Sequence, residues 1–426
     1  MSSALLKYEE AAALIAAHAA RLAPSATVQR VELDPAPDGA PGGALGRVLA
    51  RPLRADRDQP PFTSSTRDGY ACRAAEASAH RWLTIAGATR AGQPPAGPIP
   101  PGSAWEIMTG APVPAGADAV MMLEHVEAEA GNVRLLPPRA VSQGENIVAQ
   151  GAQARAGDEL LGPGHAIGFA QIALAASCGY TALEVFTRPS VAILSTGDEL
   201  VPVAAEPGPG QIRNSSSQML AAQVAAAGGD PWMLPVAADR AEALDQALEQ
   251  AAQADLLLVI GGVSAGKFDL VEPALARRGA RFHFTGLRIQ PGKPLVFGEL
   301  PGSPGSNPSP NENRAKYFFG LPGNPISSAV TFLLFAAPVL GALCGRAHHE
   351  PRFALARLAG PVNGKPGLTR FLPARCGFAG ELPQVERIEW QGSGDLAAMA
   401  RCNCFLVVPE ETGSLSAGAT VRILLL

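Results

Sequence analysis

Residues 189–200 read PSVAILSTGDEL, an apolar run that leads directly into a short polar turn. Such a run is typical of a strand that is buried on both faces of a sheet. The segments that follow it alternate between helix-like and strand-like patterns, which predicts βαβ units and a mainly parallel, doubly wound sheet. We expect this α/β domain to span residues 187–347, with residues 301–316 as a disordered hairpin insertion. Its first helix, strand, helix and strand are expected at residues 214–229, 230–239, 240–254 and 255–262.

The segments on either side of this domain show different patterns. Residues 51–143 are rich in Gly and Pro and contain short alternating runs, which is typical of a small β domain. Residues 1–50 begin with a helical pattern over 8–22, and residues 144–186 hold short turns and one further helix. Residues 348–426 have strand and turn patterns that predict a separate β-barrel or sandwich.

The composition excludes several classes of protein. The chain has 34 Lys and Arg against 38 Asp and Glu, a net charge of −4, and only 5% aromatic residues. A general nucleic-acid binder needs a basic face and stacking rings, so nucleic acid is excluded as a partner. No apolar run approaches the roughly 20 residues of a membrane helix, and Glu9 and Glu10 lie where a signal peptide would be apolar. We therefore expect a cytoplasmic protein with no membrane partner.

Cysteine and histidine give no sign of a metal or redox site. The six cysteines are scattered without a CxxC pair, which argues against zinc ribbons and thioredoxin-like sites. We interpret Cys402 and Cys404 as two side chains on one face of a strand. His348 and His349 follow a helix end with no third ligand nearby in sequence, so we assign them to a solvated loop.

Three predicted strand ends of the α/β domain carry unusual loops. Glycines let backbone N–H groups approach an anion, and a following helix N-terminus favours negative charge. Because ligands of doubly wound sheets lie beyond the carboxyl ends of the strands, three such loops would form one phosphate-binding rim. Any one of them, taken alone, is more simply a turn. The expected substrate-binding residues are Ser195, Gly197 and Asp198 in the first loop, Gly261, Gly262, Ser264 and Gly266 in the second, and Pro322, Gly323, Asn324 and Pro325 in the third.

Carboxylates lie on the same predicted edge. Asp198, Glu199 and Asp269 follow strand ends, and Asp239 ends the strand between them. Acids beside a phosphate site repel the ligand unless a divalent cation lies between them, so the sequence predicts a Mg²⁺-dependent site for a phosphorylated compound. The alternative is that Asp198 and Asp239 cap helices and that Asp269 is a solvated loop residue.

Two lysines near these loops have competing interpretations. Lys293 lies between Pro291 and Pro294, and a rigid turn that presents one ammonium suits an oxyanion; a plain surface lysine is the alternative. Gly261 to Lys267 matches the spacing of a P-loop. Phe268 stands where Ser or Thr would bind Mg²⁺, which argues against a nucleotide triphosphatase.

These motifs form part of a series that runs along nearly the whole chain. The stretches are 60–74, 107–126, 144–151, 191–201 (VAILSTGDELV), 208–222, 260–269 (IGGVSAGKFD), 291–298 (PGKPLVFG), 320–332 (GLPGNPISSAVTF) and 391–396 (QGSGDL). In sequence and in order they resemble the MoeA / gephyrin E-domain family, the molybdopterin molybdenumtransferases.

The resemblance implies an elongated, four-domain protomer. Residues 1–50 and 144–186 would form one discontinuous N-terminal dimerisation domain around the inserted β domain, 51–143. Residues 187–347 would be a MogA-like molybdopterin-binding domain and residues 348–426 a C-terminal β-barrel. Family members are homodimers in which the partner's inserted domain completes the active cleft.

The implied reaction is Mg²⁺-dependent insertion of molybdate into adenylylated molybdopterin, which yields molybdenum cofactor and AMP. A separate molybdopterin adenylyltransferase would supply the substrate. Asp269, Glu199 and Asp239 match family acids that would bind the metal and act in catalysis, and Asp68 would reach the site from the inserted domain. The further substrate-binding positions are Thr109, Lys293, Ser327, Arg375 and Ser393, with Lys293 as the first candidate for molybdate.

The chain departs from the family pattern at several positions. Thr63 and Ser64 replace Asp and Asn, and Gln153, Ile260 and Gln290 stand where Asp, Ser and Lys are usual. Loss of a lysine at 290 removes one positive charge from the expected molybdate region, at about 1.5–3 kcal/mol per unreplaced contact. A diverged paralogue that binds molybdopterin as a scaffold, without turnover, is therefore the second interpretation.

Overall fold

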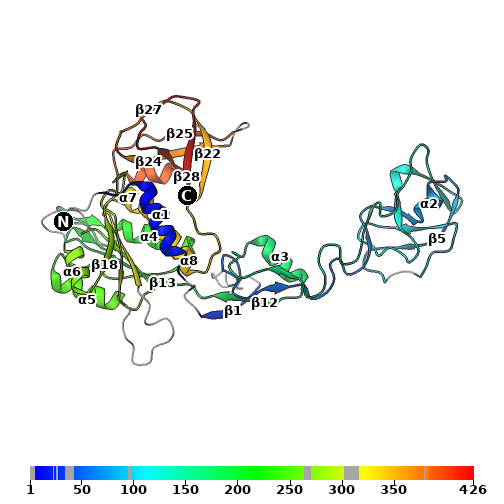
Figure 1. Ribbon diagram of the computed structural model, residues 1–426, viewed down its shortest axis with the longest axis horizontal. Coiled ribbons are helices and arrows are strands. Elements are labelled where there is room, and N and C mark those ends of the chain that lie inside the picture. Colours follow the sequence, from blue (N-terminus) through cyan, green and yellow to red (C-terminus); the bar gives the residue numbers. More distant parts are fainter. Residues whose placement is uncertain are drawn as a thin grey trace. The chain divides into compact units, whose positions relative to one another are not determined.

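The computed structural model describes residues 5–22, 24, 27–33, 43–94, 97–262, 270–301, 316–378, 380 and 382–426. The chain forms two compact units, whose helices and strands are labelled in Figure 1. The first unit comprises Met1–Ala50, Pro163–Gly168 and Ala182–Leu426. The second comprises Arg51–Gly162 and Phe169–Thr181.

A six-stranded sheet lies at the centre of the first unit. Its strand order is β16-β13-β17-β21-β20-β18; the first four strands are parallel, and β20 and β18 are antiparallel to their neighbours. The expected mainly parallel sheet is confirmed, with an antiparallel pair at one edge. The expected disordered insertion at 301–316 lies almost wholly outside the described residues. The strands are β13 (Ser190–Ser195), β16 (Asp230–Met233), β17 (Leu256–Ile260), β18 (Arg281–Thr285), β20 (Val296–Leu300) and β21 (Lys316–Leu321).

Helices cover both faces of this sheet because its strands are apolar on both sides. On β13, Val191 and Ile193 face a core that includes α1, α4, α7 and α8. Ala192 and Leu194 face the opposite core, formed with α5 and α6 (Figure 1). The doubly wound arrangement expected from the sequence is thereby confirmed. The helices are α1 (Tyr8–Ala19), α4 (Ser215–Ala226), α5 (Ala241–Ala251), α6 (Val271–Arg277), α7 (Pro325–Thr331) and α8 (Ala337–Leu343).

One helical segment of the described chain, Pro325–Leu343, is long and apolar enough to cross a membrane, with a mean hydropathy of 2.0. It joins α7 and α8 through a π-helical turn, Phe332–Ala336. The expectation that no apolar run approaches this length is therefore wrong. Its most apolar stretch is 89% buried inside the protein, and Phe332 and Phe335 are fully buried in the core. Packing against the sheet accounts for its apolar surface.

The C-terminal part of the first unit is a closed five-stranded barrel. Strands β24-β25-β22-β28-β26 pair in that order, and a further pairing of β24 with β26 closes the ring. The expected β-barrel is confirmed. Cys404 opens β26, but Cys402 lies before it at the end of α9, so the expectation that both share a strand face is wrong. The elements are β22 (Phe353–Leu358), β24 (Thr369–Gly377), β25 (Gln384–Arg387), α9 (Leu396–Arg401), β26 (Cys404–Val408) and β28 (Thr420–Leu425).

Short strand pairs complete the first unit. The strand β19 (Ile289–Gln290) runs parallel to β24 and links the α/β sheet to the barrel within the chain. The other pairs are β1 (Val28–Glu32) with β12 (Ala182–Phe186), β14 (Leu200–Val201) with β15 (Ile212–Arg213), and β23 (Val362–Asn363) with β27 (Ser414–Leu415).

The second unit holds a β-sheet within residues 51–143, where the Gly/Pro-rich pattern predicted a small β domain, and it also includes residues 144–162 and 169–181. Its six-stranded sheet has the order β7-β4-β6-β5-β9-β8. The strands are β4 (Gly69–Cys72), β5 (Leu83–Thr89), β6 (Ser103–Ile107), β7 (Ala119–Met122), β8 (Val126–Glu129) and β9 (Asn132–Leu135). Smaller elements are β2 (Leu53–Arg54) with β11 (Glu159–Leu161), β3 (Ser64–Ser65) with β10 (Ile147–Val148), α2 (Ala74–Ala77), a 3₁₀ turn (Leu123–His125) and α3 (Phe169–Ser177).

Candidate functional site

A cleft of about 700 Å³ opens at the carboxyl ends of the adjacent parallel strands β13, β17 and β21. All three loops expected from the sequence contribute to its wall. The lining residues from these loops are Ser195, Thr196 and Glu199, then Gly261 and Gly262, then Gly323, Asn324 and Pro325. The structure thus brings together the described parts of the three loops, as expected for ligand sites of doubly wound sheets. Ser264, Gly266 and Asp269 lie outside the described residues.

The loops touch one another at glycines, and at position 261 the backbone conformation requires one. Gly261 has φ +83°, and a Cβ there would lie 3.0 Å from the carbonyl oxygen of Thr196 in the first loop. A Cβ on Gly323, in the third loop, would lie 3.8 Å from the Cα of Gly261. The three loops therefore pack closely against one another at Gly261 and Gly323.

The backbone amides of the loops differ in what they can offer a ligand. The amide of Gly197 donates to the carbonyl of Ala237 (3.3 Å), and that of Gly261 donates to the carbonyl of Leu321 (3.1 Å). These two amides are used by the fold. The amides of Gly262 and Gly323 donate to no acceptor among the described residues, so both are available to an anion.

The N-terminus of α4 forms a wall of the cleft that the list of expected site residues missed. Arg213, Asn214, Ser215 and Ser216 all line the cleft. Asn214 caps the helix by accepting from the amide of Ser217 (3.1 Å), while Ser216 Oγ donates to the carbonyl of Gly323 (3.3 Å). The pattern Arg-Asn-Ser-Ser-Ser predicted the helix start. If the start of this helix had also been assigned to the carboxyl edge of the sheet, the positive end of its dipole would have been recognised as facing the ligand.

The first loop supplies one carboxylate to the cleft. Glu199 lines it, and a Cβ on Gly197 would collide with the Glu199 carboxylate, which therefore lies over that glycine. Asp198 Oδ1 accepts from the amide of Asp239 (3.1 Å), but neither acid caps a helix, because the N-cap of α5 is Arg240 and no side chain caps it; the alternative interpretation of these two acids is therefore wrong. Asp239 is exposed and does not line the cleft. None of these three acids is in an ion pair with another described residue.

Three of the expected binding residues serve the fold instead of facing the cleft with a free polar group. Ser195 is 1% exposed, and its hydroxyl lies 2.7 Å from that of Ser217. The carbonyl of Pro322 accepts a short hydrogen bond from Ser328. Ser327 is buried within α7 and does not line the cleft.

Ser393, which the resemblance gave as a substrate-binding residue, does not line the cleft but is bonded to the third loop. Asn324 Nδ2 donates to Ser393 Oγ (2.9 Å), and the amide of Ile326 donates to the Ser393 carbonyl (3.0 Å). Gly394 and Leu396, just beyond it, line the cleft. The segment between β25 and α9 therefore fixes the loop that precedes α7.

The two basic residues expected near molybdate are placed elsewhere. Lys293 is exposed in the turn between β19 and β20 and does not line the cleft. Arg375 is exposed on β24, in register with Glu386 on β25, and does not line the cleft either. Among the described lining residues Arg213 carries the positive charge, with its Nε bonded to the carbonyl of Ala205 (3.0 Å).

In the second unit, Asp68 and Thr109 form one hydrogen-bonded group. Asp68 Oδ1 accepts from the amide (2.6 Å) and the hydroxyl (2.8 Å) of Thr109. These two hydrogen bonds, first that from the backbone N–H, lower the pKa of the exposed Asp68 carboxyl. The side chain is therefore held ionised and oriented at the surface of this unit.

The structure shows the surroundings of several side chains at which the chain departs from the family pattern. Ile260 is 2% exposed and belongs to the core on one face of the sheet. Gln290 has a buried Oε1 with no hydrogen-bond partner among the described residues. Thr63 Oγ1 accepts from the amide of Gln150 (3.2 Å). The substituted side chains at 260 and 63 therefore pack or bond locally.

Comparison with protein families finds three matches along the chain. Residues 6–179 match the MoeA N-terminal region (domain I and II). Residues 192–342 match a probable molybdopterin binding domain, and residues 355–426 match the MoeA C-terminal region (domain IV). The matched segments occur in the order expected from the motifs.

Similar proteins cover most of the chain. A molybdopterin molybdenumtransferase of a Nostoc species is 33% identical over 386 residues, 89% of this chain and 86% of that protein. The Haemophilus influenzae protein of the same name is 33% identical over 389 residues, 88% of this chain and 90% of its own length. A crystal structure of a molybdopterin biosynthesis MoeA protein from Pyrococcus horikoshii aligns with a TM-score of 0.77, 27% identity, and coverage of 99% of this chain and 100% of that one.

Proposed function

Because the chain belongs to the MoeA family and is an enzyme of molybdenum cofactor biosynthesis, we propose that it inserts molybdate into adenylylated molybdopterin and releases AMP. The observation that carries this proposal is the cleft of about 700 Å³ at the strand ends, where three loops and the N-terminus of α4 meet. This arrangement offers backbone amides and a helix dipole to the phosphates of such a substrate.

The described residues divide the recognition of the substrate between them. The amides of Gly262 and Gly323, with the first turn of α4, would bind the phosphates. Arg213 would neutralise part of the charge, since it is the cationic side chain on the described wall of the cleft. Asn324, oriented by its bond to Ser393, would contact the substrate from the opposite loop. Lys293 does not line the cleft, so contact of its ammonium with molybdate would require the turn between β19 and β20 to move toward the cleft.

The described part of the cleft contains one carboxylate, that of Glu199, which suits a magnesium ion. Glu199 presents an exposed carboxylate with no ion pair to the described residues, and carboxylate oxygens are the donors that Mg²⁺ prefers. We assign the metal to Glu199 and Asp269, with Asp239 as a further candidate beside Asp198. When bound, Mg²⁺ would neutralise phosphate charge and polarise the phosphoanhydride.

The cleavage step releases AMP from the phosphoanhydride of the substrate. A water oxygen forms the new bond to phosphorus, the bridging P–O bond breaks, and AMP leaves. We assign the water's proton to Asp269 as general base. Dehydrating the nucleotide end of the substrate in the cleft would strengthen the bonds from the loop amides.

Further features of the proposal follow from the family resemblance. We propose a cytoplasmic homodimer in which Asp68 and Thr109 of one chain complete the cleft of the other. A separate molybdopterin adenylyltransferase would supply the substrate. The ionised, oriented Asp68 carboxylate suits a role toward a metal-bound or cationic group.

The proposal is tested by AMP release from adenylylated molybdopterin with and without molybdate and Mg²⁺. We expect AMP formation that requires both, and loss of at least about 100-fold in rate on Glu199→Gln, the scale of removing one electrostatic contact in an active site. Glu411→Gln, an exposed carboxylate on the barrel side, is the matched control and should leave the rate unchanged. Tight substrate binding without AMP release would instead support the scaffold interpretation.

A further inference from the structure

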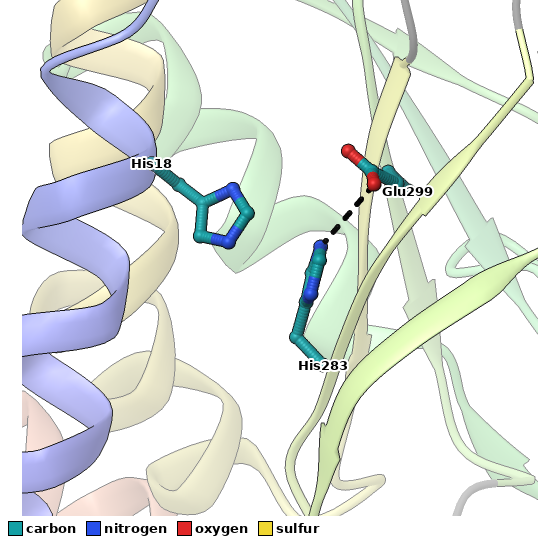
Figure 2. Close-up of side chains that lie close together, drawn as sticks. All are labelled: His18, His283 and Glu299. Atoms are coloured by element: carbon teal, nitrogen blue, oxygen red, sulfur yellow. Dashed lines mark ion pairs between the residues drawn. The ribbon is translucent and has the colours of Figure 1, made fainter.

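We propose that His18, His283 and Glu299 form a zinc-binding site between helix α1 and the antiparallel edge of the six-stranded sheet. His18 lies in the last turn of α1, His283 on β18 and Glu299 on β20. One ligand atom from each side chain lies within 4.8 Å of the other two. Figure 2 shows both imidazole rings and the carboxylate converging on the same space between helix and strands.

The spacing within this cluster suits a shared metal better than a hydrogen bond. His283 Nε2 lies 3.7 Å from Glu299 Oε1, too far for a hydrogen bond. Two ligands on one tetrahedral Zn²⁺, each about 2.1 Å from the metal, are separated by roughly 3.4 Å. The three ligand atoms lie within 4.8 Å of one another, so metal binding requires the side chains to close in by at most about 1.4 Å.

An unsatisfied buried nitrogen is the second observation that points to a ligand. The His283 side chain is 9% exposed, and its Nε2 has no hydrogen-bond partner among the described residues. A buried polar atom without a partner is costly, so its position toward Glu299 calls for an occupant. A metal ion between the two groups would satisfy the nitrogen and one carboxylate oxygen together.

The surroundings keep both imidazoles in the form that binds metal. Burial, the largest cause, lowers the pKa of His18 and of His283 below the ordinary value of 6.5. A neutral imidazole has one lone pair to offer. His18 Nδ1 lies 3.0 Å from the hydroxyl of Tyr317, and donation by Nδ1–H would leave Nε2 free for the metal. This is the outer-shell bond that usually orients a metal-binding histidine.

Charge and donor chemistry favour Zn²⁺ over the magnesium of the cleft. Two nitrogens and one carboxylate oxygen match zinc sites, whereas Mg²⁺ prefers oxygen donors alone. Arg281 Nη1 lies 3.4 Å from Glu299 Oε1, but its side chain is 76% exposed and its charge is screened by solvent. None of the three proposed ligands lines the substrate cleft, so this site does not depend on the proposed reaction.

A metal ion at this site would hold separate elements of the fold together. The ion would tie α1 to β18 and β20, elements that are distant in the chain. A ligand that binds the folded state and not the unfolded one raises stability with its concentration. We therefore assign to zinc the role of fixing the N-terminal helix on the sheet.

The test uses the full chain, stripped of metal with a chelator, incubated with Zn²⁺ and passed over a desalting column. We expect one zinc per chain to remain on the wild-type protein and its unfolding temperature to rise. His283→Ala and Glu299→Gln should each weaken binding by at least about 100-fold, because even outer-shell changes weaken it about 10–100-fold. Co²⁺ in the same site should show the visible absorption of a tetrahedral complex in the wild type only.

His348→Ala is the matched control, since it removes an exposed imidazole outside the cluster and should bind zinc as the wild type does. Glu299→Gln nearly conserves the side-chain shape, so it decides the matter if His283→Ala fails to fold. Zinc bound equally by the wild type and Glu299→Gln, or no zinc retained by the wild type, would overturn the proposal.

Discussion

Gly261 is where the first and second loops of the cleft touch. Its φ of +83° lies in the left-handed region, and a Cβ would come 3.0 Å from the carbonyl oxygen of Thr196. We expect Gly261→Ala to lower the free energy of unfolding by about 1–2 kcal/mol from backbone strain alone. Chemical denaturation measures this change.

Gly360→Ala is the control for this substitution, because a Cβ there meets no atom within 4 Å and its φ is ordinary. Equal stability of the two variants would show that the loops tolerate separation. Backbone strain would then not explain why residue 261 is a glycine.

Single residues also show which features of the cleft could be predicted from the sequence and which could not. Glycines at strand ends were predictable, since turns and close approaches require them. The position of Lys293 away from the cleft was not predictable, because its turn follows β19, whose partner β24 lies 80 positions away in register (Ile289 with Thr369). A side chain's distance from a cleft depends on such long-range pairing, which no local pattern contains.

Helix α4 is the element that closes one wall of the cleft. Asn214 caps it through the amide of Ser217 (3.1 Å) and lines the cleft as well. We expect Asn214→Ala to cost about 0.5–2 kcal/mol of stability through loss of the cap. The same variant should raise the KM for adenylylated molybdopterin, because a frayed helix end presents fewer ordered N–H groups.

Gln218→Ala on the exposed side of α4 provides the comparison, since alanine is an equal or better helix former there. An Asn214→Ala protein with wild-type stability and KM would contradict the role of this helix end. Denaturation and steady-state kinetics supply the two readings.

The packing of α1 on the sheet edge should make stability depend on pH. Burial lowers the pKa values of His18 and His283 below 6.5 in the folded protein, whereas both titrate near 6.5 when unfolded. Below about pH 6.5 the unfolded chain therefore binds more protons, and the free energy of unfolding falls as pH is lowered. Measured with chelator present, this slope should be smaller in His283→Gln.

The groups that face these histidines also set the size of the effect. Glu299 raises both pKa values, whereas Arg281 lowers both and Arg21 lowers that of His18. A steeper fall of stability in His283→Gln than in the wild type would refute the assigned direction.

At the level of elements, the periodicity of apolar residues predicted most of the fold. The apolar run of β13 and the capped helix α4 were predicted with their types and near their ends, because burial on both faces and a side-chain cap leave local signatures. The antiparallel addition of β20 and β18 left no such signature. Contacts such as Asn324 with Ser393 link the α/β sheet to the barrel and are invisible in either segment alone.

For the whole molecule, the proposed sharing of sites between two chains leads to a complementation experiment. Asp68→Ala removes the group of the second unit, and Glu199→Gln removes the carboxylate of the cleft. Each variant alone should be inactive. If partner chains complete each other's clefts, mixed and reassembled protein should regain about a quarter of the wild-type activity, because half of the dimers are hybrids with one intact site.

No recovery on mixing two inactive variants would place both groups in the same chain's site, whereas an Asp68→Ala protein that is active alone would remove Asp68 from catalysis. Each variant unfolded and reassembled alone is the control for the mixing procedure. Subunit exchange itself can be followed with differently tagged chains, so that failure to mix is told apart from failure to complement.

Adenylylated molybdopterin is proposed to bind in the cleft at the ends of β13, β17 and β21. The most direct measurement is a crystal structure of the Glu199→Gln protein with that substrate. We predict its phosphates within hydrogen-bond distance of the amides of Gly262 and Gly323, beside the first turn of α4. Phosphates bound instead in the other large cleft, of about 690 Å³, next to Arg346 and Arg352, would contradict the account.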